Sequence, residues 1–159
     1  MGLSSHYVST GYIYDQKSAR FLLIQHKKLG VWLAPGGHLE EGEEPHAGAL
    51  REVWEEIGQE GQIIDLLAAP QVATPTVPQL PAPFCVLSEL IPAGPHDGEH
   101  IHIDFVYVVE IDPDAELNLS EAEVSHAHWF AADEIDTLDT YENVKQVCRV
   151  ISRSTVRVH

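Results

Sequence analysis

The chain is short of cysteine, of basic residues and of long apolar runs, and each shortage excludes a class of protein. Its two cysteines, Cys85 and Cys148, lie far apart and outside any Cys-x-x-Cys pair, which excludes a disulfide framework and a cysteine-based zinc site. This cysteine usage suggests a reducing compartment. Because the N-terminus has no basic region followed by an apolar run, we expect no secretion signal and a cytoplasmic protein. No apolar run approaches the roughly 20 residues that span a bilayer.

Basic side chains are scarce relative to acidic ones. The 159-residue chain has 9 Lys and Arg against 25 Asp and Glu, a formal net charge of −16 at pH 7. Such a surface repels a nucleic-acid backbone and an anionic membrane, so we expect neither as a partner. A polyphosphate substrate would need cations to approach it. The length and the apolar content of 44% suit a single domain, residues 1–159, with a real core.

The segment from Gly37 to Gly58 combines a turn rich in glycine and glutamate with a predicted helix that starts at Pro45. At about 100° per residue, one stripe of this helix is apolar, and glutamates cluster roughly 160° away around it. The apolar stripe consists of Leu50, Val53, Trp54 and Ile57, and the cluster consists of Glu52, Glu55 and Glu56. We therefore expect the stripe to be buried and the carboxylates to lie on the opposite side.

The carboxylate cluster needs an explanation, because like charges one turn apart destabilise a helix. No Lys relieves the repulsion from the neighbouring i+4 positions, which hold Gln59 and Glu60. One interpretation is a solvated acidic face, which is common in acidic proteins. The other is a site for a hard divalent cation such as Mg²⁺, which takes oxygen ligands from carboxylates and substrate phosphates. The Gly36–Gly37 pair could bring backbone carbonyls toward the same face.

The same segment resembles the Nudix box, the sequence motif of the Nudix hydrolase family. The resemblance rests on Gly37, Glu43 and the run REVWEEIG from Arg51 to Gly58, each at its fixed offset. One position departs from the family pattern, since an aliphatic residue usually follows the last glycine and this chain has Gln59 there. That position concerns packing, so the departure casts little doubt on catalysis.

Segments outside the box, WLAPGG at 32–37 and HWF at 128–130, extend the resemblance over most of the chain. The resemblance implies an α/β fold: a Nudix-like α/β/α sandwich, with a mixed β-sheet between the box helix and the C-terminal helix. Strand patterns elsewhere agree with this fold, including a hairpin over residues 6–26 and strands at 84–91 and 100–109. The topology follows from the resemblance, because the strands alone would allow other α+β folds.

The resemblance also implies a metal-dependent hydrolase. Such an enzyme cleaves a phosphoanhydride bond in a nucleoside diphosphate linked to another moiety, as in a nucleoside triphosphate, oxidised or not, or an ADP-ribose-like compound. By this analogy Mg²⁺ or Mn²⁺ would be held by Glu52, Glu55, Glu56 and the Gly37 carbonyl. Arg51 and Glu43 would fix these carboxylates in their catalytic positions. Glu56, Glu52 and Glu123 compete for the role of catalytic base, Glu123 lying in an acidic loop outside the box.

The predicted strand at 100–109 alternates strictly, which places His100, His102 and Asp104 on one face. Two histidines and an aspartate could ligate a transition metal, but the sequence predicts no fourth ligand. The preferred interpretation is that the three side chains line a substrate cleft, because burying them without partners would cost free energy.

Five prolines between residues 70 and 83 exclude a helix there and argue against a central strand. This segment is either a stiff extended connection or a substrate-side loop on a rigid scaffold. Pro75 falls where some Nudix subfamilies with ADP-ribose substrates carry a proline.

The sequence leaves three other classes of function open. A non-catalytic, nucleotide-sensing Nudix-fold module would not need all three glutamates of the cluster. An isomerase of prenyl diphosphates would need a placed cysteine, and Cys85 has no obvious partner. A purely structural protein leaves the carboxylate repulsion unexplained. The expected partner is thus a small nucleotide or diphosphate substrate; many family members form homodimers, although no interface stripe stands out here.

Overall fold

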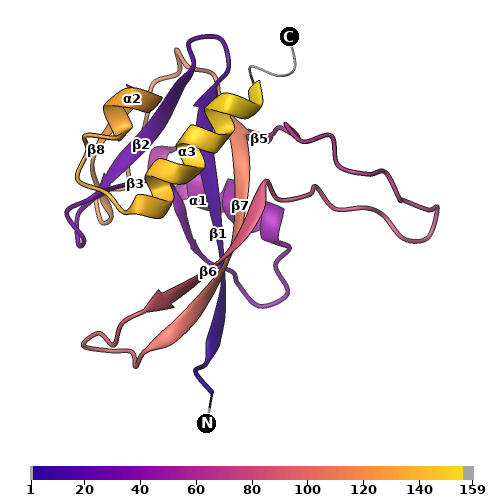
Figure 1. Cartoon of the computed structure of the whole chain (residues 1–159), viewed down its shortest axis with the longest axis horizontal. Coiled ribbons are helices and arrows are strands. Elements are labelled where there is room, and N and C mark those ends of the chain that lie inside the picture. The colour runs from indigo at the N-terminus through magenta and orange to yellow at the C-terminus, as the bar shows by residue number, and fades with distance from the viewer. Residues whose placement is uncertain (1, 156–159) are drawn as a thin grey trace.

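The computed structural model describes residues 2–155, which form a mixed β-sheet with helices on both faces (Figure 1). The strands are β1 (Ser5–Asp15), β2 (Arg20–His26), β3 (Trp32–Leu33), β4 (Gly36–His38), β5 (Gln62–Ile63), β6 (Cys85–Ile91), β7 (His100–Glu110) and β8 (Val124–Ala131). The helices are α1 (Pro45–Ile57), α2 (Ala132–Ile135) and α3 (Glu142–Thr155). The predicted α/β sandwich is confirmed. No helix within these residues has the length and apolar character needed to cross a membrane.

Strand β1 lies at the centre of the sheet. One edge of β1 pairs in parallel with β7, in a register that runs from Ser5 opposite Ile101 to Ile13 opposite Val109. The other edge is shared, since its C-terminal part forms the predicted antiparallel hairpin with β2 and its middle pairs with β4. Strands β8 and β6 extend the sheet beside β2 and β7. The parallel pairing brings residues about a hundred positions apart in sequence side by side.

The two faces of the sheet build two hydrophobic cores, because alternate residues of a strand point to opposite sides. Tyr12 and Tyr14 of β1 belong to the core under α3, and Ile13 between them belongs to the core under α1. Helix α3 contributes an apolar stripe, Val144, Val147, Cys148 and Ile151, all buried. Burial raises the pKa of the Cys148 thiol to about 12, so this cysteine is an unreactive core residue.

Helix α1 begins at Pro45, as predicted, and ends at Gly58, which adopts the left-handed conformation (φ 68°). The Gly58 N–H donates a hydrogen bond to the carbonyl of Trp54, which closes the last turn. The helix packs closely on β1 because Gly11 has no side chain: a Cβ there would lie 2.9 Å from Cγ2 of Val53.

The orientation of α1 corrects the expected position of the carboxylates. Trp54 of the predicted stripe is 59% exposed, whereas Glu56 is only 3% exposed. The buried face is therefore rotated by roughly 70° from the apolar stripe, toward the glutamates. The rotation places Ala49, Val53 and Ile57 against the sheet and carries Glu56 into the interior with them. The helix does not simply expose its acidic side; it buries part of it.

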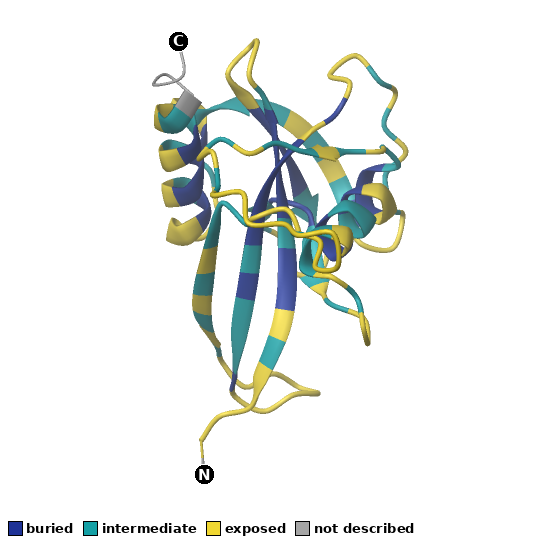
Figure 2. Cartoon of the chain, turned by 90° about the vertical axis from the view of Figure 1, so that its right-hand side faces the viewer, coloured by how far each residue is buried: buried dark blue, intermediate teal, exposed yellow. Residues whose placement is uncertain are grey.

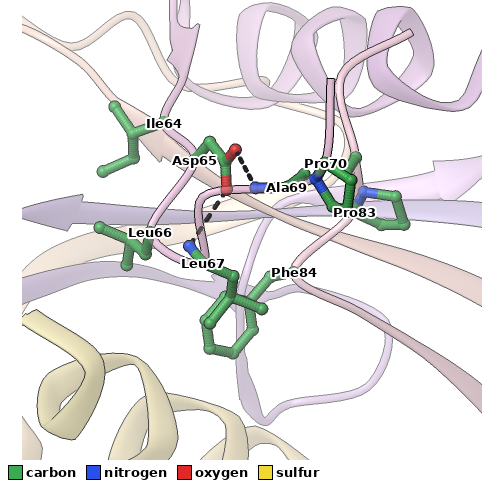
Figure 3. A pocket seen from close by; sticks show the side chains of 9 residues that line it. Ile64, Asp65, Leu66, Leu67, Ala69, Pro70, Pro83 and Phe84 are labelled. Atoms are coloured by element: carbon green, nitrogen blue, oxygen red, sulfur yellow. Dashed lines mark hydrogen bonds between the residues drawn. The ribbon is translucent and has the colours of Figure 1, made fainter. Parts of the chain in front are cut away.

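The connection after α1 is mostly irregular, with only the short strand β5 at its start. Residues 64–84 form a long extended loop that projects from the body of the protein (Figure 1). A cavity at its base is lined mainly by apolar residues such as Leu66 and Phe84 (Figure 3). The Asp65 carboxylate there accepts hydrogen bonds from the backbone N–H groups of Leu67 and Ala69. No residue of the Nudix box lines this cavity.

Candidate active site

Glu56 of α1 lies at the centre of the candidate site, with its side chain buried against the start of β4. Its carboxylate accepts a hydrogen bond from the Gly36 N–H, but its Oε2 has no hydrogen-bond partner among the residues described. Burial, followed by the charges of Glu52 and Glu123, raises the pKa of Glu56 to about 8. A buried acceptor without a partner is costly, and a cation is one way to satisfy it.

Glu52 lies one helical turn before Glu56 and faces Gly37 of β4. A Cβ at Gly37 would lie 2.4 Å from Oε1 of Glu52, so only glycine leaves room for this carboxylate. Burial raises the pKa of Glu52, while hydrogen bonding from Arg51 opposes the rise. The pairing of Gly37 with Ser9 of β1 holds the β4 backbone, and with it the Gly37 carbonyl, at this end of the helix.

Replacing Gly37 with Ala is expected to displace the Glu52 carboxylate, because the new methyl group occupies its space. We expect Mg²⁺ affinity to fall by about 10- to 100-fold, as when a ligand loses its positioning, while the fold persists. Calorimetric titration with Mg²⁺ measures the change. Gly94→Ala is the matched control, since nothing lies within 4 Å of a Cβ there. An unchanged Mg²⁺ affinity in Gly37→Ala would contradict this account of Gly37.

Arg51 links the turn before the helix to the carboxylate cluster. Its Nε and Nη2 donate to the two oxygens of Glu43 at 2.8 and 3.0 Å, and Nη2 also donates to the His38 carbonyl. Its Nη1 donates to Oε1 of Glu52 at 2.8 Å and to Oε2 of Glu55 at 3.2 Å. The hydrogen bonds from Arg51 lower the pKa of Glu43. Arg51 and Glu43 thus lie where they can fix the carboxylates, as the resemblance implies.

Arg51 also relieves part of the repulsion among the clustered carboxylates. The positions four residues after Glu55 and Glu56 hold Gln59 and Glu60, neither of which is a cation. Arg51 lies four residues before Glu55 and beside Glu52, and it offsets charge on both. The buried Oε2 of Glu56 is still left without a protein hydrogen-bond partner within residues 2–155.

Glu123 comes to the same site from a distant part of the sequence. It lies in the turn just before β8, where its carbonyl accepts a hydrogen bond from the Lys27 N–H at 2.8 Å. Its negative charge contributes to the raised pKa of both Glu52 and Glu56, so it lies within electrostatic range of them. Glu55 is at the outer edge, with a side chain 43% exposed. The structure therefore brings together all the carboxylates that the sequence analysis selected for metal binding and catalysis.

These residues fit a divalent cation. The site offers an unpaired buried oxygen on Glu56, raised carboxyl pKa values that added positive charge would reverse, and a gap kept open by a glycine. Carboxylate and carbonyl oxygens are the ligands that Mg²⁺ and Mn²⁺ prefer.

The three polar residues predicted on one face of β7 separate into two groups. Asp104 is buried and accepts hydrogen bonds from the Thr10 hydroxyl, with both oxygens at 2.9 Å; burial, opposed by that bond, raises its pKa to about 7. His100 and His102 instead join His6 and His38, two residues that the sequence analysis did not select. Burial, followed by these neighbouring histidines, lowers the pKa of His102 to about 4. The sequence pattern places His6 on a strand. It does not show that this strand pairs in parallel with β7, which brings His6 next to His102.

The fold is an α/β/α sandwich. Its candidate site gathers glutamates from helix α1 and from the loop before β8 around the glycines of β4. The NUDIX domain profile matches residues 5–149. The chain belongs to the Nudix family.

Two curated relatives and one solved structure illustrate the similarity. Nudix hydrolase 2 from Arabidopsis thaliana is 25% identical over 161 residues, which cover 96% of this chain and 50% of that protein. A MutT-like protein from Streptomyces ambofaciens is 39% identical over 61 residues, 38% of this chain and 40% of that protein. This chain therefore spans half or less of the length of both. A NUDIX-family hydrolase from Clostridium perfringens has the same fold, with a TM-score of 0.72 at 21% identity over 97% of this chain and 98% of that one.

Proposed function

We propose that this protein is a metal-dependent Nudix pyrophosphohydrolase that cleaves a phosphoanhydride bond in a nucleoside diphosphate linked to another moiety. The observation that carries the proposal is the buried, partly unpaired carboxylate of Glu56, with Glu52 and Glu123 close enough to raise its pKa. Such an arrangement is costly in a protein that uses it only for structure. A bound cation would offset this cost by stabilising the ionised carboxylates, and it would also bind the phosphates of the substrate.

Each residue of the site has a proposed part. Glu52, Glu55, Glu56 and the Gly37 carbonyl would hold Mg²⁺ or Mn²⁺. When bound, the metal supplies the positive charge that a polyphosphate needs and makes water more acidic. Arg51 and Glu43 act as positioning residues that hold the carboxylates in place. Glu56, Glu52 and Glu123 are the candidates to accept the proton of the attacking water.

The rest of the substrate is proposed to extend past β4 to Asp104 and Thr10, which lie on the face of the sheet opposite the carboxylates. Asp104 is 6% exposed, yet its pKa of about 7 lets its carboxyl group be either an acceptor or a donor near neutral pH. A group that can play both parts suits recognition of a polar base or sugar edge. His100 and His102, the other two residues expected in the cleft, instead belong to a cluster with His6 and His38.

A product-release assay across a panel of substrates tests the proposed function. The panel holds nucleoside triphosphates with oxidised counterparts, ADP-ribose, dinucleoside polyphosphates and a nucleotide sugar, each with and without Mg²⁺. We expect Mg²⁺-dependent release of a phosphate or a nucleoside phosphate from at least one class. Tight nucleotide binding without product release from any of them would overturn the proposal and favour a nucleotide-sensing module.

A further inference from the structure

Four histidines from three strands meet at one end of the sheet: His6 of β1, His38 of β4, and His100 and His102 of β7. One ring nitrogen from each lies within 4.8 Å of those of the other three. The rings of His6 and His100 stack with their centroids 4.3 Å apart, and the His38 ring meets that of His102 edge-on at 4.9 Å. Nothing in the proposed hydrolysis uses this cluster.

The strand register explains why these side chains converge. His6 is directly opposite His102 in the parallel pair of β1 and β7, and His100 lies two residues earlier on the same face. On the other edge of β1, His38 is opposite Val8, which is two residues from His6 and so also shares its face. Gly37 points toward Glu52 of α1, and its neighbour His38 therefore points to the opposite side of the sheet. The cluster and the carboxylates lie on different faces.

A backbone carbonyl orients one imidazole of the cluster. Nδ1 of His100 lies 2.7 Å from the Gly98 carbonyl oxygen. A carbonyl only accepts, so Nδ1 carries the proton and Nε2 of His100 keeps a free lone pair. That Nε2 lies 3.0 Å from Nε2 of His102, inside the cluster. A histidine whose second nitrogen donates to a carbonyl is the usual arrangement of a metal ligand, because the hydrogen bond fixes both tautomer and ring orientation.

We propose that His6, His38, His100 and His102 form a binding site for a divalent transition-metal ion of the Zn²⁺ type. Imidazole nitrogen suits Zn²⁺, whereas Mg²⁺ prefers oxygen, so the site is chemically distinct from the carboxylate cluster. Four nitrogens at about 2.0–2.1 Å from a tetrahedral Zn²⁺ are about 3.3 Å from one another, a spacing that small side-chain rotations reach from the observed positions. His100 is buried and His38 is exposed, which gives the site both an interior wall and an opening to solvent.

The site would tie together the part of the sheet that has the least cover. The first residues of β1 and β7 and the last of β6 project beyond the helices (Figure 1), and exposed residues are frequent along this end (Figure 2). A metal ion bound here would link β4, β1 and β7 on the face of the sheet opposite α1. It also anchors His38, whose neighbour Gly37 faces the carboxylate site. The ion would thus order the β4 segment from the opposite face.

Cobalt spectroscopy tests the proposal in the whole protein. The chain is freed of metal with a chelator and titrated with Co²⁺, because a tetrahedral nitrogen site gives strong visible absorption and an octahedral oxygen site gives little. We expect one equivalent of Co²⁺ to produce the strong band and one equivalent of Zn²⁺ to remove it. His38→Gln, at an exposed position that leaves the core intact, is expected to lose the band. Its Zn²⁺ affinity should fall by more than the ~10- to 100-fold that loss of an outer partner costs.

Two control variants separate this site from other sources of binding. His126→Gln changes a histidine outside the cluster, whose Nδ1 lies 3.1 Å from Oε1 of Gln25. Glu52→Gln weakens the carboxylate site. Both variants are expected to keep the band. Zn²⁺ is also expected to raise the melting temperature of the wild type, but not that of His38→Gln. The proposal is overturned when the wild type shows no strong band, or when the band survives His38→Gln and disappears in Glu52→Gln.

Discussion

Glu56→Gln is expected to lower kcat by about 100- to 10,000-fold, the range that a positioned acid–base or charge-bearing group contributes. The replacement keeps the shape of the side chain and the acceptor for the Gly36 N–H, but it removes the negative charge at the centre of the carboxylate cluster. A neutral amide is a weaker ligand for a hard cation and cannot accept a proton from water. Steady-state kinetics at saturating Mg²⁺, on whichever substrate the panel assay selects, measure the effect.

Glu60→Gln is the matched control for this prediction. Glu60 lies just past the end of α1 with an exposed side chain, so the same change of charge occurs near the helix but outside the site. The control should retain wild-type kcat, and circular dichroism should show both variants folded. Turnover of Glu56→Gln within a factor of two of the wild type would remove Glu56 from the mechanism.

Much of this fold was readable from the sequence because local patterns and tertiary structure agree. Pro45 marks the start of α1, and the α3 stripe of Val144, Val147, Cys148 and Ile151 is buried as its spacing indicates. The orientation of α1 was not readable, because hydrophobicity alone sets the expected stripe and assigns Trp54 to the core. In the structure Ala49, Val53 and Ile57 face the sheet instead, which buries Glu56 and leaves Trp54 exposed.

The candidate site was predictable to the extent that it is local in sequence. Gly37, Glu52, Glu55 and Glu56 lie within one motif, and the structure gathers them as the motif implies. Glu123 was identified only by its place along the chain, yet its charge reaches Glu52 and Glu56. The histidine cluster was half visible, since alternation groups His100 with His102. His6 and His38 join them through the pairing of β1 with β7 and β4, which no pattern along the chain specifies.

The metal-free protein is expected to lose stability as the pH rises, and Glu56 is the main reason. Its folded-state pKa of about 8 lies above the ordinary value of 4.5, so the native state holds a proton that the unfolded chain releases. The stabilising effect is complete below pH 4.5 and is lost progressively up to pH 8. Between pH 5.5 and 8 this carboxyl alone should reduce the free energy of unfolding by about 3 kcal/mol. Urea unfolding in a chelator at both pH values measures the loss.

Glu56→Gln isolates this effect from the general repulsion of an acidic chain. The amide does not titrate, so the variant should be more stable than the wild type at pH 8 without metal, and its stability should depend less on pH. Saturating Mg²⁺ should reverse the order at pH 8, because the ion favours the ionised carboxylate that the metal-free site disfavours. If the free energy of unfolding changed equally with pH in the two proteins in chelator, burial would not disfavour the ionised form of Glu56. In that case the main argument for a cation between the box helix and β4 would fail.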